Sequence, residues 1–196
     1  MAKQKLAIIG DGNVGSALAK GLGRAGHEVR TVGNDPRAVG EAVSWGDIVF
    51  MAVPFAALDE IVKHAGEPLR EKTIVDVTNV ADFKTMSLSL GFTTSGAEEL
   101  QKKLPSSRIV KAFNTVFASH MDTGRLGDQQ LTAFVASNDE SAKQTVIALA
   151  KDIGFDAVNA GPLQNARYLE PLAMMNIQLG YVIGMGTQIG FKLLHG

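Results

Sequence analysis

Six residues near the amino terminus have the spacing of a phosphate-binding turn. They form the pattern G-x-G-x-x-G: Gly10, Asp11, Gly12, Asn13, Val14 and Gly15. The first glycine permits a tight turn, the second lets the backbone approach a pyrophosphate, and the third lets helix and strand pack closely. Backbone N–H groups at a helix start, with the positive end of its dipole, then hold the phosphates. The spacing predicts dinucleotide binding; the alternative is that the glycines only make a tight loop.

The segments on either side of this turn favour the dinucleotide interpretation. Residues 6–9 are an apolar run expected to be a buried strand. Residues 16–24 have helical composition, with Leu18, Ala19 and Leu22 on one face. Strand, glycine turn and helix in this order are the context that the motif requires.

The residues after the expected second strand, residues 27–32, are candidates for the ribose site: Gly33, Asn34, Asp35 and Arg37. An acidic residue about 20 positions past the motif would bind a free 2′-hydroxyl, whereas an arginine would bind a 2′-phosphate. Asp35 lies 20 residues after Gly15, and Arg37 follows two residues later, so both remain open. The other interpretation of Asp35 is a turn, or a helix N-cap for residues 37–43.

Apolar runs alternate with helical patterns along the rest of the chain. Strands are expected at residues 47–53, 73–77, 108–113, 131–136 and 157–159, and helices at 37–43, 56–64, 95–104 and 140–153. The helix at 95–104 should open with a capping box formed by Ser95 and Glu98. This alternation predicts an α/β fold with a doubly wound parallel sheet. We expect a single domain over residues 1–196, with a core at 1–160 and C-terminal helices at 161–196.

Ligands of such sheets bind outside the carboxyl ends of the strands. The residues expected there, beside the glycine turn and ribose candidates, are Ala52, Val53, Pro54, Thr78, Asn79, Phe113, Asn114 and Thr115. Asn79, Asn114 and Thr115 are candidates for orienting a bound ring, and Phe55 and Phe113 for the cleft walls. The alternatives are strand-end capping by the polar side chains and ordinary core packing of both phenylalanines.

The C-terminal stretch differs in composition from the rest. No charged residue occurs between Glu170 and Lys192, and residues 172–194 are long enough to suggest a membrane span. Polar residues interrupt this run, and five glycines at 180–196 weaken it. We therefore expect one or two buried helices that cover the cleft or form a homodimer interface, and no membrane span.

Composition excludes several classes of function. There are 19 basic and 20 acidic residues without a basic block, so no nucleic acid partner is expected. The chain has no cysteine, which excludes disulfides and thiol catalysis and fits a cytoplasmic location. The four histidines show no ligand spacing, so no metal is expected. The first apolar segment is too short for a signal peptide.

Several further segments together indicate a family. Beside residues 10–15, they are Gly26-His27-Glu28-Val29, Ala52-Val53-Pro54-Phe55, Asp76-Val77-Thr78-Asn79, Lys111-Ala112-Phe113-Asn114-Thr115, Ala160-Gly161-Pro162-Leu163 and Asn165-Ala166-Arg167. In these segments the chain resembles the NADP oxidoreductases dependent on coenzyme F420, a deazaflavin, and is similar to the oxidoreductase domain of the STEAP metalloreductases. The resemblance spans nearly the whole chain. It implies a single Rossmann domain, NADP(H) on the glycine loop, and a small-molecule acceptor in the same cleft, either coenzyme F420 or a flavin.

One departure from that family concerns the 2′-phosphate. The family usually has Gly-Ser-Arg at the end of the second strand, where this chain has Val32, Gly33 and Asn34. An asparagine supplies neither a charge nor a guanidinium fork. We expect NADP(H) with Arg37 as the remaining charge, and NAD as the alternative.

Hydride transfer between a nicotinamide and a flavin-type ring is carried by the cofactors, so the lack of a Ser-His-Asp or paired-carboxylate constellation is compatible with it. A non-catalytic sensor or scaffold protein that binds NADP(H) would show the same absence. A two-domain hydroxyacid or imino-acid dehydrogenase is less favoured, because few residues follow the last expected strand.

Overall fold

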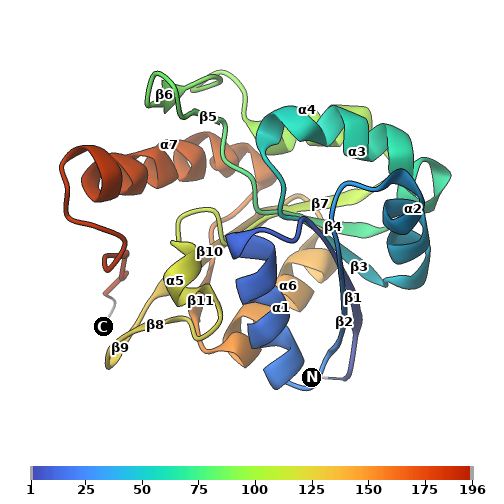
Figure 1. The fold of residues 1–196 in the computed structure, drawn as a ribbon, viewed down its shortest axis with the longest axis horizontal. Coiled ribbons are helices and arrows are strands. Elements are labelled where there is room, and N and C mark those ends of the chain that lie inside the picture. The colour runs from blue at the N-terminus through green and yellow to red at the C-terminus, as the bar shows by residue number, and fades with distance from the viewer. Residues whose placement is uncertain (1, 195–196) are drawn as a thin grey trace.

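The computed structural model describes residues 2–194 and is built around a seven-stranded sheet (Figure 1). Its strands lie in the order β11-β10-β7-β4-β3-β1-β2. Their bounds are β1 Lys5–Ile9, β2 Glu28–Val32, β3 Ile48–Met51, β4 Thr73–Asp76, β7 Arg108–Lys111, β10 Thr132–Ser137 and β11 Asp156–Asn159. The predicted fold class is confirmed: helices flank a mostly parallel sheet.

Two strands depart from the expected parallel arrangement. The five strands from β2 to β7 are mutually parallel, but β10 pairs antiparallel with β7, and β11 runs parallel to β10. A parallel neighbour requires a crossover of about a dozen or more residues, usually through a helix, whereas an antiparallel one does not. Between β7 and β10 the chain forms only the short helix α5 (Ala118–Met121) and a hairpin of β8 (Arg125–Leu126) and β9 (Gln129–Gln130). It therefore enters β10 in the reverse direction.

Helices cover both faces of the sheet, because its strands are apolar on both sides. Leu6 and Ile8 of β1 face a cluster that includes α1 (Asn13–Arg24), α5 and α6 (Glu140–Ile153). Ala7 and Ile9 of the same strand face the opposite cluster. That cluster includes α2 (Pro36–Trp45), α3 (Leu58–Ala65), α4 (Gly96–Lys103) and α7 (Ala166–Ile177).

Most expected helices lie within a few residues of their predicted bounds, and the helix at 140–153 coincides with α6. Ser95 caps α4 as predicted: its Oγ accepts a hydrogen bond from the Glu98 N–H at 3.2 Å. The reciprocal contact joins the two side chains, since Ser95 Oγ donates to Glu98 Oε2 at 2.8 Å. Short 3₁₀ turns occur at η1 (Phe55–Ala57), η2 (Glu67–Leu69) and η3 (Leu163–Asn165). The weakly periodic residues 80–94 contain a small hairpin of β5 (Ala81–Asp82) and β6 (Ser87–Leu88).

The C-terminal region holds one α-helix, not two, within the described residues. Helix α7 continues as a π-helical turn, η4 (Gln178–Val182), and residues 183–194 form neither helix nor strand. This tail returns to the sheet, where the Thr132 N–H donates to the Phe191 carbonyl oxygen at 3.0 Å. The tail is less buried than expected: Ile183 is 67% and Met185 57% exposed. Within residues 2–194, no helix has both the length and the apolar composition needed to cross a membrane.

Candidate functional site

The glycine turn brings α1 into close contact with the ends of β1 and β3. Gly10 has φ = +117°, and a Cβ there would lie 2.2 Å from the carbonyl oxygen of Ala52. A Cβ on Gly15 would lie 1.8 Å from the Gly10 carbonyl oxygen. Around Gly12, by contrast, an added Cβ meets nothing within 4 Å. Gly12 is the N-cap of α1 and makes no side-chain hydrogen bond to it, so no cap side chain occupies the first N–H groups.

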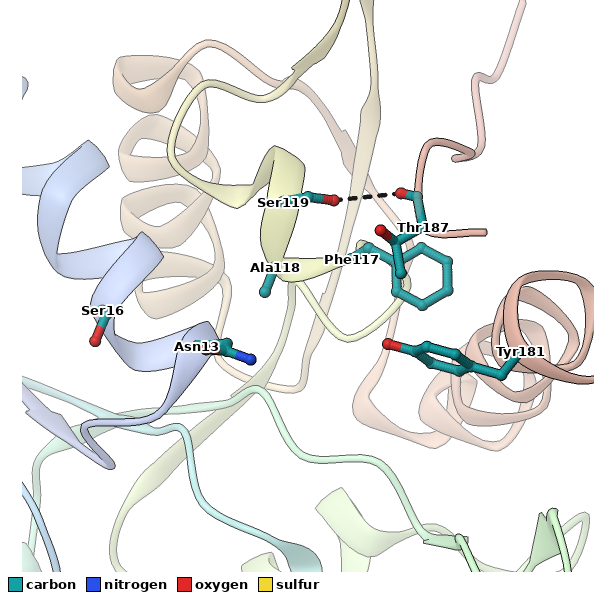
Figure 2. A pocket seen from close by; sticks show the side chains of 7 residues that line it. All are labelled: Asn13, Ser16, Phe117, Ala118, Ser119, Tyr181 and Thr187. Carbon is teal, nitrogen blue, oxygen red and sulfur yellow. Dashed lines mark hydrogen bonds between the residues drawn. The ribbon is translucent and has the colours of Figure 1, made fainter. Parts of the chain in front are cut away.

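A cavity of about 420 Å³ opens beside the start of α1 (Figure 2). Its lining comes from α1, α5 and the C-terminal region: Asn13, Ser16, Phe117, Ala118, Ser119, Tyr181 and Thr187. Figure 2 shows the side chains of Asn13 and Tyr181 pointing toward each other across it. The Tyr181 ring packs edge-on against Phe117, with centroids 5.6 Å apart and an interplanar angle of 85°. The C-terminal region thus forms one wall of this space.

A second cavity of about 210 Å³ shares Asn13 and Tyr181 with the first and extends toward the centre of the sheet. Its deeper lining includes Asn79 after β4, Asn114 after β7 and Asn176 of α7. The sequence-predicted residues Asn13, Val14, Asn79 and Asn114 therefore line one space together.

Asn79 and Asn114 hold each other at the inner end of the second cavity. Asn79 Nδ2 donates to the Asn114 carbonyl oxygen at 3.0 Å, and Asn114 Nδ2 donates to Asn79 Oδ1 at 3.1 Å. Asn114 Nδ2 also donates to the Leu169 carbonyl oxygen at 3.0 Å, which fixes the orientation of its amide. Asn114 is 5% exposed, yet its Oδ1 has no partner within the described chain. A buried amide oxygen without a partner is costly, and a bound amide or hydroxyl donor would satisfy it.

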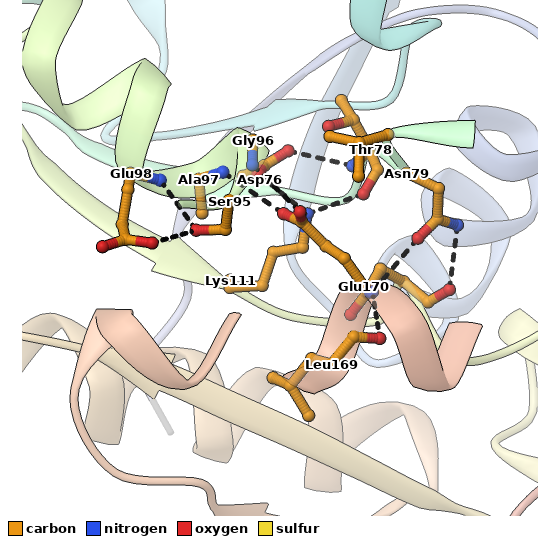
Figure 3. A network of polar contacts seen from close by, with 12 residues as sticks. Asp76, Thr78, Asn79, Ser95, Gly96, Ala97, Glu98, Lys111, Leu169 and Glu170 are labelled. Carbon is orange, nitrogen blue, oxygen red and sulfur yellow. Dashed lines mark hydrogen bonds and ion pairs between the residues drawn. The ribbon is translucent and has the colours of Figure 1, made fainter. Parts of the chain in front are cut away.

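A fully buried ion trio lies next to these asparagines (Figure 3). Lys111 Nζ is 2.9 Å from Asp76 Oδ2 and 2.9 Å from Glu170 Oε1, and it donates to the Thr78 carbonyl oxygen at 2.6 Å. Glu170 Oε2 accepts a hydrogen bond at 2.9 Å from the Gly96 N–H at the start of α4. The trio therefore joins β4, β7, α4 and α7 beneath the cavity.

The charges of this trio stabilise one another. Burial disfavours the Lys111 ammonium, but the carboxylates of Asp76 and Glu170 outweigh burial and raise the pKa of Lys111 above its ordinary value. At the amino end of α4, Glu170 also accepts the hydrogen bond from the Gly96 N–H. Asp76 and Lys111 face each other on the neighbouring strands β4 and β7. Each is a charged residue inside an apolar run, and this signal in the sequence could have predicted their pairing. No linear pattern pointed to Glu170.

The ribose candidates lie at the opposite end of the glycine turn. Asp35 is the N-cap of α2, where its Oδ1 accepts from the Ala38 N–H at 2.8 Å. Its N-cap interpretation is thus realised. Arg37 is exposed, and its Nε donates to Glu41 Oε1 at 2.9 Å. This hydrogen bond and the charge of Glu41 raise the pKa of Arg37. Arg37 is therefore ion-paired along its own helix.

The expected aromatic walls lie elsewhere. Phe113 is fully buried, and its ring packs against Phe50 and Phe155 with centroids 6.2 and 5.8 Å away. Its side chain belongs to the core, so its assignment as a cleft wall is wrong. Its backbone has φ = +64°, in the left-handed region, and this turn is followed by Asn114. Phe55 lines a groove between α3 and α4, with its ring against Gly96.

The remaining expected residues lie at strand ends without lining either cavity. Ala52, Val53 and Pro54 follow β3, and Thr78 follows β4. The Thr78 hydroxyl is buried and lacks a partner within residues 2–194. Thr115 is buried, and its carbonyl oxygen accepts from Asn176 Nδ2 at 3.1 Å. Thr115 lines neither cavity, so the structure does not support its expected role in orienting a bound ring. Phe117, Ser119, Tyr181 and Thr187 were missed, because no local pattern marks them.

The amino-terminal part of the chain, residues 5–80, matches a known protein family. Residues 5–40 and 31–80 match the model of the family described as "NADP oxidoreductase coenzyme F420-dependent". The F420-dependent NADP reductase of Methanocaldococcus jannaschii is 32% identical over 148 residues, which is 71% of this chain and 64% of the relative. Membership of this family supports NADP(H) binding.

Metalloreductases are also similar to this chain. Metalloreductase STEAP3 of Rattus norvegicus is 29% identical over 184 residues, or 87% of this chain. Human metalloreductase STEAP2 is 28% identical over 199 residues, or 92% of this chain. The matched regions are only 36% and 38% of these relatives, so the chain spans little more than a third of their length.

A solved structure matches along the full length. It is a protein from Arthrobacter sp. FB24 assigned as an F420-dependent NADP reductase, with a TM-score of 0.89 and 30% identity over 98% of this chain and 100% of that one. Imine reductase from Pseudomonas sp., at 17% identity and a TM-score of 0.66, shares the fold over 92% of this chain and 63% of its own. With its glycine turn, its paired asparagines and these relatives, the chain belongs to the NADP oxidoreductase family that depends on coenzyme F420.

Proposed function

We propose that this protein is a cytoplasmic oxidoreductase that transfers a hydride between a nicotinamide dinucleotide, NADP(H) by family membership, and a flavin-type acceptor, either coenzyme F420 or a flavin. The observation that carries the proposal is Asn114, which lines a cavity that begins at the glycine turn and whose buried Oδ1 has no partner within the described residues. The bound dinucleotide and acceptor supply the redox chemistry; the protein supplies orientation and a water-poor space.

The glycine turn would hold the pyrophosphate. The first N–H groups of α1 carry the positive end of the helix dipole, and the space around Gly12 is open. Gly10 and Gly15 keep the turn close to β3 and to α1, so the backbone can reach the phosphates. Asp11, Asn13 and Val14 complete this loop.

The paired asparagines would orient the nicotinamide ring. Asn114 Oδ1 would accept a hydrogen bond from an amide donor, such as the carboxamide of a nicotinamide. The partners of its Nδ2 prevent the amide from rotating, so this acceptor is fixed before a ligand binds. Asn79 acts by holding Asn114.

The larger cavity would take the acceptor ring. It has an aromatic side, formed by Phe117 and Tyr181, and a polar side that includes Asn13 and Ser119. A flat tricyclic ring with polar edges fits such a lining, since aromatic side chains pack against its faces and polar groups satisfy its edges.

The test is oxidation of NADPH, followed by absorbance at its nicotinamide band, with coenzyme F420, FMN, FAD or ferric citrate as acceptor. We expect turnover with one of the ring acceptors and tight dinucleotide binding without any acceptor. Tyr181→Ala should raise the KM for the acceptor and leave dinucleotide affinity unchanged. Binding of NADPH with no turnover for any acceptor would instead favour a sensor or scaffold protein.

We also propose that the protein is a homodimer that buries the exposed apolar side chains at the end of α7 and after it. Met175, Val182, Ile183 and Met185 are each more than half exposed, and no charged residue lies between Glu170 and Lys192. Contiguous apolar exposure of this kind marks interfaces, and a second copy can cover it symmetrically. Light scattering should give a dimer for the native protein and a monomer for Ile183→Glu. A native monomer would contradict the proposal.

A further inference from the structure

The loop after β1 folds against the end of β2. The Gly10 N–H donates to the Val32 carbonyl oxygen at 2.8 Å, so the glycine turn and the residues after β2 lie side by side. Asp11 occupies the first x position of the G-x-G-x-x-G turn. Its two carboxylate oxygens lie 3.1 and 3.6 Å from the position that a Cβ on Gly33 would take. A carboxylate therefore lies next to the position where the family's serine would stand.

A second carboxylate follows directly. Asp35 is fixed as the N-cap of α2 by its hydrogen bond from the Ala38 N–H. From Gly33 to Glu41 the sequence has one cation, Arg37, and its guanidinium is already paired with Glu41. Arg37 is thus paired with Glu41 and influenced by the charge of Asp35, while Asp11 lies beside Gly33.

The nearest cation on β2 is also engaged. The guanidinium of Arg30 lies 4.1 Å from the centroid of the Trp45 ring, over its face. Stacking on an aromatic ring holds Arg30 against α2. Both guanidinium groups therefore have partners on α2, and position 34 itself carries no charge.

We infer that the ribose end of this site selects a free 2′-hydroxyl, so that NAD(H) binds at least as tightly as NADP(H). The inference rests on the proposed dinucleotide site. A carboxylate accepts a hydrogen bond from a ribose hydroxyl, but it repels a phosphate that carries nearly two negative charges. Arg37 can leave Glu41 at low cost, because exposed ion pairs are weak, yet it would then offset only part of the repulsion from Asp11 and Asp35.

The experiment is titration of the purified protein with NADH and with NADPH, followed by ligand fluorescence at one ionic strength and without an acceptor. We expect the Kd for NADH to be equal to or lower than that for NADPH. Asp11→Asn keeps the shape of the side chain and removes its charge. It should tighten NADPH binding by about tenfold and change NADH binding little.

A second variant tests the other carboxylate. Asp35→Asn retains a good N-cap acceptor, so α2 should remain intact. It should also favour NADPH, by less than Asp11→Asn. The matched control is Glu67→Gln, which makes the same charge change on η2. This turn leads into the amino end of the central strand β4, whereas the glycine turn follows the carboxyl end of β1. Glu67→Gln should change neither affinity.

Two results would overturn the inference. One is a native protein that binds NADPH about tenfold or more tightly than NADH, a difference of about 1.4 kcal/mol. The other is an Asp11→Asn variant in which both affinities change equally. Failure of both dinucleotides to bind would contradict the proposed site and the inference with it. Binding with the expected preference, but without turnover on any acceptor, would count against the proposed reaction alone.

Discussion

The two ends of the proposed dinucleotide site are built differently. At the inner end, Asn114 is buried, hydrogen-bonded on three sides and supported by the Lys111 trio. At the outer end, Arg37 and Glu41 form an ion pair with exposed side chains along one helix. Buried polar groups must be satisfied with fixed geometry, whereas exposed charges can be exchanged at little cost to the fold. The difference indicates that the reacting end is fixed by the fold, while the ribose end can change its preference through surface substitutions.

The largest expected effect is at the trio. Lys111→Met removes the cation and leaves Asp76 and Glu170 buried without a counter-ion. Breaking a buried ion pair in this way costs about 3–5 kcal/mol, measured as the free energy of unfolding in urea at neutral pH. The exposed pair of Lys102 and Glu99 is the control, and Lys102→Met should cost less than about 1 kcal/mol. Equal losses for the two variants would contradict the contrast drawn here.

A substitution in the glycine turn should weaken dinucleotide binding while the protein still folds. Gly12→Val places a side chain in open space, so the protein should fold with a loss of about 1 kcal/mol or less at this N-cap. Its branched side chain would occupy the pyrophosphate position and weaken NADPH binding by at least about tenfold. Gly23→Val, also in open space near the end of α1, should leave binding unchanged. Unchanged NADPH affinity in folded Gly12→Val would show that the site is wrongly placed.

The next largest effect is expected when the side-chain amide of Asn114 is removed. Asn114→Ala leaves the Leu169 carbonyl oxygen and Asn79 Oδ1 without their donor and removes the free acceptor. We expect a stability loss of about 1–3 kcal/mol, with a fall in kcat for NADPH oxidation. Asn159→Ala, at the exposed end of β11, is the control and should leave kcat unchanged. Native kcat in Asn114→Ala would remove this residue from the site.

A smaller effect should depend on pH. Arg167 of α7 donates two hydrogen bonds to Glu98 of α4, at 2.8 and 2.7 Å. These bonds outweigh burial and lower the pKa of Glu98, with help from Ser95. A carboxyl whose pKa is lower in the folded state stabilises the protein above its unfolded pKa, and that stability is lost as the pH falls through the folded value. Unfolding curves of the native protein and Arg167→Met should therefore differ near neutral pH and converge in acid.

The smallest effect is expected at the outer end. Arg37→Ala removes an exposed ion pair and should leave stability within about 0.5 kcal/mol of the native value. It should weaken NADPH binding only about threefold, because Arg37 offsets little of the repulsion, and should not change NADH binding. A loss of tenfold or more for NADPH alone would show that Arg37 is the main ligand of a 2′-phosphate.

Local signals predicted much of this fold. The glycine spacing, the Ser95 capping box and the apolar period of residues 140–153 each act within a few residues, so the sequence carries them directly. The reversal of β10 depends on the path between strands, which residue types do not specify. Phe113 was misplaced because a strand-end aromatic has the same pattern whether its ring faces the cleft or the core.

In the candidate site too, some residues were predicted from local sequence signals and others depend on tertiary packing. Asn79 and Asn114 were predicted from their places after two strands, and they meet because neighbouring parallel strands end at one edge. Glu170, Phe117 and Tyr181 reach the site through tertiary packing of α7, α5 and the C-terminal region. Their contribution depends on distances between elements that are far apart in the sequence.

The chain after α7 is held at both ends across the rim of the larger cavity. Its start continues from α7, and the Thr187 carbonyl oxygen accepts from Ser119 Oγ at 3.2 Å and contacts His120 Nε2 at 2.9 Å. Met185 lies between these anchors and is 57% exposed. Because the chain has no cysteine, Met185→Cys would carry the only thiol in the molecule. A fluorophore or spin label attached there would report the surroundings of this segment, including its burial in the proposed homodimer, without removal of any other reactive group.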